Sequence, residues 1–320
     1  MREDDLIFIF SLPRSGSTLL QRMLFRATEV KSIGEPAVLL PLLYHRYKKE
    51  IYSSYNVQVF SEGVDDLVSL YRNGWDDYDA ELRTFVLKLY ENALGENGKY
   101  FVDKTPRYSL IAPEIVKLFP RAKFIFLWRD PLRIVDSTIE SLWSGRWLPS
   151  RIAIDFEQGV QGLCSAAEVL GERAIHIRYE ELVTAPEEKF ELLLNELGMA
   201  HLFEGIGREL PVRLGSLGDP ATTSTSKAIF KTSASRPLQH MESLVRQRWI
   251  LKRFSKFPSN YWSYLGKSYS NVESELSKCP IGFQQSLVDA GRSMFAWSDS
   301  KFDFSVRKDR LKSKFCYVCR

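Results

Sequence analysis

Short apolar runs alternate with segments of helical periodicity along this chain, and that alternation limits its fold more than any other feature. The runs cover residues 6–11, 99–105, 122–130 and 173–179. Helical patterns are seen over 17–26, 36–50, 79–95, 112–120, 131–143, 151–170 and 185–198. Strands that are apolar throughout are typical of parallel sheets with helices on both faces. The sequence therefore predicts an α/β sandwich of three layers around a central parallel sheet.

Charge and hydropathy exclude two classes of protein. The formal charge is +4 over 320 residues, and residues 301–320 hold seven Lys or Arg against two Asp or Glu. The rest of the chain is therefore close to neutral, unlike a nucleic-acid binder. We expect the basic tail to be a solvated terminus. No apolar stretch reaches the roughly 18–20 residues that span a bilayer, and the start lacks a secretory signal. The sequence predicts a cytoplasmic protein without a transmembrane segment.

The loop after the first apolar run has the composition of an anion site. It reads "SLPRSGSTLLQRML" over residues 11–24. A strand, a short turn and a helix aim backbone N–H groups and the helix dipole at one point, and Gly16 lets the backbone come close. Ser15, Ser17 and Thr18 add hydroxyl donors, and Arg14 adds a planar fork. This makes the predicted sandwich P-loop-like, although the lysine of a nucleotide-hydrolysing P-loop is missing. The alternative is a plain turn between strand and helix.

A second anion site is expected after the third apolar run. Arg129 ends that run, while Arg133 and Ser137 lie four residues apart on the following helix. The alternative is an Arg129–Asp130 ion pair beside a solvated helix face. Two anion sites on neighbouring strand–helix units fit a ligand with two separated anionic groups on a nucleoside scaffold.

Four motifs in order resemble the sulfotransferases that use 3′-phosphoadenylyl sulfate (PAPS), in particular their bacterial and tyrosylprotein branch. "PRSGSTLL" resembles the 5′-phosphosulfate loop of that family, and "FLWRDPLRIVDS" resembles its 3′-phosphate motif. "IRYEELVTAPEEKFELLLNELG" and the "GDP" at 218–220 are similar to the segments that follow. The resemblance covers about residues 5–240. The pattern of elements weakens after residue 265, so we expect a sulfotransferase domain over 1–265 and leave 266–320 as an unassigned extension that carries the basic tail.

The resemblance also implies a reaction and roles for individual residues. An acceptor hydroxyl attacks the sulfuryl group in line, and 3′,5′-ADP (PAP) leaves. The resemblance implies that Arg14, Lys104 and Glu35 are the catalytic residues. Lys104 would lie at the leaving oxygen and Glu35 would act as general base; the alternative for Glu35 is a helix cap. Cofactor binding falls to the loop and the second site, namely Arg14, Ser15, Gly16, Ser17, Thr18, Arg129 and Ser137, with Tyr179 and Lys231.

The acceptor side is less defined. Because residues 51–98 contain many aromatic side chains, we expect this segment to be helical and to line the acceptor side. The stretch 215–237 is rich in Ser and Thr, and we expect it to be a lid loop. Protein tyrosine, a saccharide, a lipid headgroup and a small metabolite all remain open as hydroxyl acceptors. No metal is expected, because Cys316 and Cys319 have no second Cys/His pair beside them. Two other functions stay open: a nucleotide-dependent kinase or NTPase, and a non-catalytic nucleotide-binding module.

Overall fold

The computed structural model describes residues 1–47, 57–202 and 237–291. Their centre is a five-stranded sheet in the order β2-β3-β1-β4-β5, in which every pairing is parallel. The strands are β1 (Leu6–Phe10), β2 (Val30–Ser32), β3 (Tyr100–Asp103), β4 (Lys123–Trp128) and β5 (Ala174–Arg178). The predicted α/β fold with a central parallel sheet is confirmed. The sequence missed β2, because this strand is three residues long and only its valine is apolar.

The order of the strands places the functional loops side by side. From β1 the chain first moves to the edge at β2 and returns through β3, and then crosses to the other side of β1 to form β4. The direction of winding therefore reverses beside β1. In open parallel sheets, ligands bind outside the carboxyl ends of the strands at such a reversal. The segments after β1, β3 and β4 carry the predicted site residues, and they meet at this edge.

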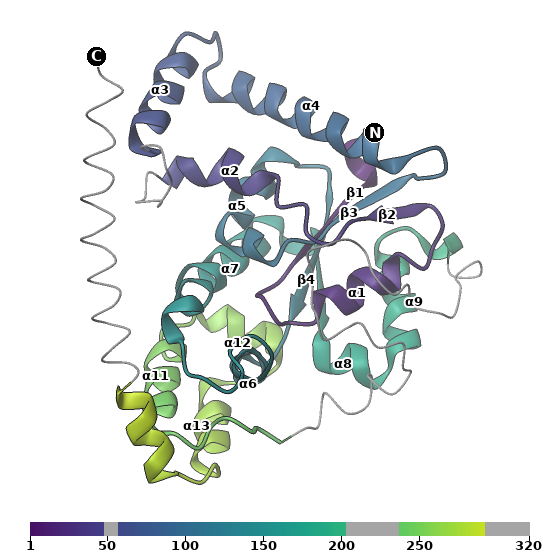
Figure 1. The fold of residues 1–320 in the computed structure, drawn as a ribbon. Helices are drawn as coiled ribbons and strands as arrows, with labels where there is room; N and C mark the ends of the chain where they lie inside the picture. Colours follow the sequence, from purple (N-terminus) through teal and green to yellow (C-terminus); the bar gives the residue numbers. More distant parts are fainter. Residues whose placement is uncertain (48–56, 203–236, 292–320) are drawn as a thin grey trace.

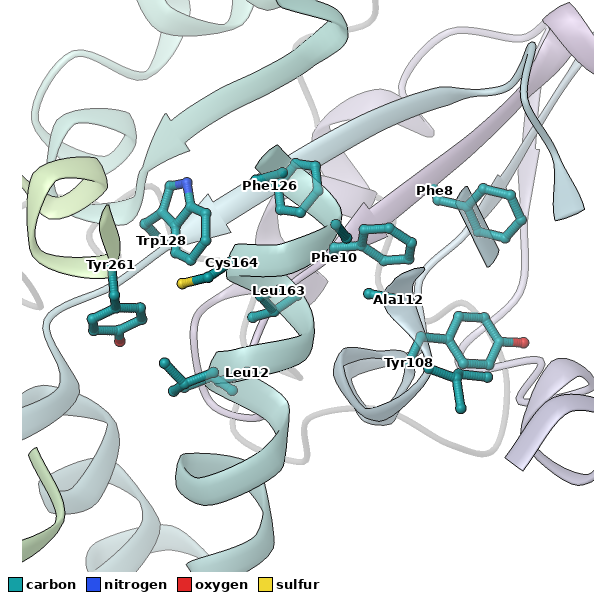
Figure 2. Close-up of a cluster of buried hydrophobic side chains, with 14 of the residues drawn as sticks. Phe8, Phe10, Leu12, Tyr108, Ala112, Phe126, Trp128, Leu163, Cys164 and Tyr261 are labelled. Carbon is teal, nitrogen blue, oxygen red and sulfur yellow. The ribbon is translucent and has the colours of Figure 1, made fainter. Parts of the chain in front are cut away.

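Alternate residues of the strands enter two separate cores. Phe8 and Phe10 of β1 stack on Phe124 of β4, with ring centroids 5.6 and 5.5 Å apart. Figure 2 shows this aromatic face, which Tyr108 and the helical residues Leu163 and Cys164 cover. Residues of the opposite parity, such as Ile9 and Ile125, face a second core of leucines. Period-2 alternation in a sheet buried on both faces produces this division.

Helices cover both faces, as the sequence predicted. Helix α1 lies with α8 and α9 against one face, and α4, α5 and α7 lie against the other (Figure 1). The helices are α1 (Ser17–Leu24), α2 (Leu39–Leu43), α3 (Val57–Ser69), α4 (Trp75–Leu94), α5 (Ala112–Leu118), α6 (Pro131–Ser141), α7 (Val160–Leu170), α8 (Tyr179–Thr184), α9 (Pro186–Glu196), α11 (Leu244–Phe254), α12 (Ser259–Leu265) and α13 (Tyr269–Ser277).

Two predicted helices are shorter than expected. The pattern at 36–50 forms only α2 and a 3₁₀ helix over Tyr44–Tyr47, and residues 48–50 lie outside the described part. The pattern at 151–170 begins with a 3₁₀ turn and the π-helical segment Asp155–Gly159 before α7. This segment passes close to the turn after β3, since a Cβ on Gly159 would lie 2.7 Å from Ser109 Oγ. A π-helical segment is rare and occurs mostly as a single turn within an α-helix, as it does here before α7.

Two of the remaining predictions about organisation concern residues that lie outside the described part of the chain. The expected lid at 215–237 lies outside the described residues except for residue 237, and so does the basic tail. The division at residue 265 stays a prediction. Within the described ranges, every helix is too short or too polar to cross a lipid bilayer.

Asp155 gives the fold a predictable pH dependence. Its side chain is buried against Arg107, with 3.4 Å between Oδ1 and Nε. Burial raises the pKa of the Asp155 carboxyl from 3.8 to about 6, and Arg107 offsets part of this increase. Because the folded pKa exceeds the unfolded one, the contribution of this group to stability is present below about pH 4 and is lost as the pH rises through about 6.

We expect Asp155→Asn to be more stable than the wild type at pH 7.5, by up to roughly 3 kcal/mol for a shift of about two pKa units. At pH 5 the advantage should shrink, because the wild-type carboxyl is then largely protonated. Thermal unfolding of the variant and the wild type in matched buffers measures the stability difference at pH 7.5 and at pH 5. Asp77→Asn is the control, since hydrogen bonds from Asn73 lower the pKa of that exposed carboxyl and its charge should not destabilise the fold. An Asp155→Asn variant no more stable than wild type at pH 7.5 would contradict the prediction.

Candidate active site

Three cationic side chains meet at the carboxyl ends of the central strands. Arg14 lies in the loop after β1, Lys104 follows β3, and Arg129 follows β4. These neighbouring strands are about 4.8 Å apart in a parallel sheet, so the residues that follow them are brought into one small region. The sequence could predict each cation from its own motif, but their meeting depends on the strand order.

The loop after β1 has the backbone of an anion cradle. Gly16 is the N-cap of α1 with φ 89°, and it has no side chain to cap the first turn of the helix. Arg14 also lies in the left-handed region, at φ 68°. This conformation costs about 1–3 kcal/mol for a non-glycine residue and persists only where surrounding contacts enforce it. One such contact is a hydrogen bond of 2.6 Å from Arg129 Nη1 to the carbonyl oxygen of Arg14.

Tyr179 completes this loop from the segment after β5. Its ring lies under the guanidinium of Arg129, with 4.3 Å between Arg129 Cζ and the ring centroid. The same ring fills the space beside Gly16, where an added Cβ would lie 2.3 Å from Tyr179 Cε2. Gly16 is therefore required both for its positive φ and for the close approach of the tyrosine.

Arg129 and Ser137 sit together with Arg14, although the sequence analysis assigned them to different ends of a ligand. Arg14 donates weakly to Ser137 Oγ from Nε and Nη2, both at 3.4 Å. Arg129 Nε is buried without a hydrogen-bond partner among the described residues. Burial lowers the pKa of Arg129, while Tyr179 and Glu180 raise it and Arg14 lowers it further. A buried guanidinium with an unused donor beside a second arginine is suited to an anionic oxygen.

The third residue of the "VDKTP" motif, Lys104, carries a buried ammonium that contacts the loop and a carboxylate. Lys104 has no exposed surface. Its Nζ lies 3.0 Å from Glu35 Oε1 and donates to Thr18 Oγ1 at 3.3 Å. A buried charge is stable only where it is paired and hydrogen-bonded. The structure thus brings together three predicted site residues from β3, α1 and the segment after β2.

Gln21 was not predicted, and it holds the segment that carries Glu35. Its buried Nε2 donates to Ser32 Oγ at 2.6 Å, to the carbonyl of Ile33 at 2.8 Å and to that of Gly34 at 3.2 Å. Ser32 in turn donates to the carbonyl of Val102 on β3. The sequence did contain a signal for Gln21, because this polar residue stands at a position that the helical spacing predicts to be buried.

Other candidates lie elsewhere or outside the described part. Arg133 pairs with Glu275 of α13 at 2.7 Å. Lys231 lies in the undescribed stretch 203–236. Of the imidazoles that the structure describes, His176 accepts from Trp128 Nε1 at 2.9 Å and His201 lies 3.8 Å from Glu29. No group of three His, Cys, Asp or Glu able to hold a metal occurs among the described residues.

The residues present fit a ligand with two anionic groups. The loop offers the open first turn of α1 with the hydroxyls of Ser17 and Thr18, and Arg129 offers an unused buried donor. The carboxylate of Glu35 contacts Lys104 of this cationic group. Anions, and phosphate-like groups above all, are the ligands that helix N-termini and arginine forks bind.

Comparison with known families decides the identity of this fold. The model described as "Sulfotransferase family" matches residues 5–204. The chain belongs to the sulfotransferase family. The match covers β1 through α9, so it includes every predicted site residue except Lys231.

Two curated relatives to which this chain is similar are distant in sequence. The nodulation protein NoeE of Sinorhizobium fredii is 26% identical over 242 residues, covering 66% of this chain and 55% of the relative. Protein-tyrosine sulfotransferase 2 of Gallus gallus is 25% identical over 257 residues, covering 77% of this chain and 66% of the relative. The chain therefore spans between half and two thirds of the length of these relatives.

Solved structures of similar fold include a sulfotransferase domain from the curacin biosynthetic pathway. That domain is 22% identical, covers 86% of this chain and 98% of its own, and has a TM-score of 0.43. The mouse sulfotransferase SULT7A1 complexed with PAP is 14% identical, covers 86% and 90% of the two chains, and has a TM-score of 0.46.

The geometry of Gly16 predicts a selective loss of anion binding. Gly16→Ala adds a Cβ that overlaps Tyr179, so the ring must leave its place under Arg129. We expect at least a ten-fold weaker affinity for PAP, measured by calorimetric titration. Gly198→Ala is the matched control, because Gly198 has a similar positive φ of 65° and its nearest atom would be Lys123 Nζ at 3.9 Å. Equal PAP affinity in both variants would show that Tyr179 does not shape the loop.

Proposed function

We propose that this protein transfers a sulfuryl group from PAPS to an acceptor hydroxyl and releases PAP. The observation that carries this proposal is the contact of buried Lys104 with both Thr18 of the anion loop and Glu35. An anion cradle, a cation and a carboxylate in one chain of contacts are the groups that in-line transfer between two oxygens needs. Membership in the sulfotransferase family supports the same reaction.

The proposed step forms one bond to sulfur and breaks another. The acceptor oxygen bonds to sulfur while the bond from sulfur to the 5′-phosphate oxygen breaks, and the bonding electrons leave with PAP. Glu35 takes the proton of the acceptor hydroxyl as general base. Lys104 stabilises the negative charge that grows on the leaving oxygen. Arg14 and the loop hold the 5′ end of the cofactor, and Arg129 with Ser137 holds the 3′-phosphate.

Glu35 and Lys104 form an ion pair that positions both groups for the proposed reaction. The 3.0 Å ion pair keeps the carboxylate next to the sulfuryl site and orients one of its oxygens. Thr18 links the same ammonium to the first turn of α1, so the lysine lies between the base and the anion loop. Positioning and charge stabilisation provide most of the catalysis in the related chemistry of phosphoryl transfer.

The acceptor class is a hydroxyl-bearing molecule. Several relatives are named protein-tyrosine sulfotransferases, among them one from Drosophila melanogaster that is 30% identical over 209 residues. A tyrosine hydroxyl in a peptide is therefore the first acceptor to test, followed by saccharides, lipid headgroups and small phenols. The cytoplasmic location, the contribution of Lys231 and independence from metals stay predictions.

Ligand-dependent stability separates this function from its alternatives. PAP should raise the melting temperature by several degrees at a concentration 100 times its Kd, because that occupancy stabilises the fold by about 2.7 kcal/mol. ATP and AMP should raise it much less, since neither carries a 3′-phosphate. The assay is run with Mg²⁺ and again in EDTA, because a Mg²⁺-dependent kinase or NTPase should be stabilised by ATP only when Mg²⁺ is present, whereas PAP should stabilise a sulfotransferase in both buffers. Equal stabilisation by ATP would favour the kinase or NTPase, and PAP binding without transfer from labelled PAPS to any acceptor tested would favour a binding module.

Variants of Glu35 and Lys104 test the two chemical roles. Glu35→Gln keeps the size of the side chain but removes its basicity, so kcat should fall by about 10²–10⁴-fold. Lys104→Met should also lower kcat, because its charge acts most on the transition state. PAP affinity should change little in Glu35→Gln. The helix-cap alternative predicts the reverse, a loss of about 1 kcal/mol in stability at nearly wild-type kcat. Parallel measurement of kcat, PAP affinity and thermal stability decides between them.

A further inference from the structure

A buried carboxylate lies directly behind Lys104 and is used by no step of the proposed reaction. Asp103, the last residue of β3, has no exposed surface. Three hydroxyl groups donate to it: Tyr90 Oη to Oδ2 at 2.5 Å, Tyr108 Oη to Oδ2 at 3.0 Å, and Thr105 Oγ1 to Oδ1 at 3.0 Å. A buried charged group with this many donors belongs to a network in which each member constrains the next.

The carboxylate sets the direction of hydrogen bonding in this network. An ionised carboxylate can only accept hydrogen bonds, so each of the three hydroxyl groups must donate its single proton to Asp103. The oxygens of Thr105 and Tyr108 are thereby left to accept from other groups. Each accepts a backbone N–H: Ala37 N donates to Thr105 Oγ1 at 3.1 Å, and Leu39 N donates to Tyr108 Oη at 3.2 Å.

These two amides belong to the segment that follows Glu35. Ala37 has a φ of 54°, in the left-handed region that a residue with a side chain adopts at a cost. The hydrogen bond to Thr105 is therefore one of the contacts that hold this backbone in place. On the other side of Glu35, Gln21 holds the carbonyls of Ile33 and Gly34. Glu35 thus lies on a short segment that is fixed at both ends.

We propose that Asp103 is a positioning residue for Glu35, acting through Thr105 and Tyr108 on the backbone of residues 37–39. This inference rests on the proposed function for its catalytic consequence, but its structural part does not. Because Asp103 precedes Lys104 in the chain, the same strand end places the leaving-group cation and the support of the base. Asp103, which contacts neither substrate, would then control the distance between Lys104 and Glu35.

Tyr90 provides a matched control within the same network. It donates to the same carboxylate oxygen as Tyr108, and its ring stacks on Phe101 at 4.5 Å, a contact that phenylalanine retains. Tyr90 comes from α4, however, and no hydrogen bond links it to residues 33–39 in the described part of the chain. Tyr90→Phe and Tyr108→Phe therefore remove the same kind of bond to Asp103, but only Tyr108→Phe removes the acceptor of Leu39 N.

The test combines amide exchange with kinetics on the full-length chain at pH 8. Burial raises the pKa of Asp103 to about 6, while Tyr90, Tyr108, Thr105 and Lys104 lower it, so the carboxyl is ionised at this pH. Hydrogen exchange of peptides covering 33–40 is followed in the wild type, Tyr90→Phe, Tyr108→Phe, Thr105→Val and Thr105→Ser. Turnover uses labelled PAPS and a tyrosine peptide, or another acceptor found active.

Tyr108→Phe and Thr105→Val should exchange faster over 33–40 and lose about ten- to a hundred-fold in kcat, as expected for a small misplacement of a catalytic group. Their affinity for PAP should stay within about two-fold of the wild type. Tyr90→Phe should match the wild type in both exchange and kcat, and Thr105→Ser should restore both, since it keeps the hydroxyl.

Two results would overturn the inference. One is an equal effect of Tyr90→Phe and Tyr108→Phe on kcat, which would mean that Asp103 serves only the stability of the core. The other is unchanged exchange over 33–40 in Tyr108→Phe. If the wild type shows no transfer to any acceptor, the proposed function fails, whereas the exchange pattern still confirms or refutes the positioning of residues 37–39.

Discussion

The buried charge of Lys104 is the interaction on which the rest of this site depends. An ammonium without exposed surface must be paired where it lies, and the groups that pair it are Glu35 and Thr18. This requirement ties the end of β3 to the segment after β2 and to the first turn of α1. The three segments are far apart in the sequence, and the contacts of Lys104 join them into one unit.

The second unit is built around Arg129. Its guanidinium lies over the ring of Tyr179, donates to the carbonyl of Arg14, and retains a buried donor without a partner among the described residues. Tyr179 in turn occupies the space that only a glycine at position 16 leaves open. Segments that follow β1, β4 and β5 therefore support one another, and the strained backbone of the loop is held by contacts from outside it.

The local motifs were predictable because each depends on a short stretch of chain. The apolar runs at 6–11, 99–105, 122–130 and 173–179 are strands, and the strand–loop–helix around Gly16 has the positive φ that the glycine allows. The strand β2 was missed, since three residues with one apolar side chain carry no periodic signal. The helix expected at 36–50 begins only at Leu39, because the backbone at Ala37 is left-handed and its N–H donates to Thr105.

By itself the sequence determined the α/β class, the anion loop at 14–18, the cationic residues that follow β1, β3 and β4, and the family that these motifs resemble. The tertiary structure alone decided which of these residues touch. The contact of Lys104 with Glu35, the tyrosine beneath Arg129 and the Asp103 network all join residues whose distance follows from the order of the strands. Parallel strands separated by long crossovers can pair in several orders, and only packing of the whole sheet selects one.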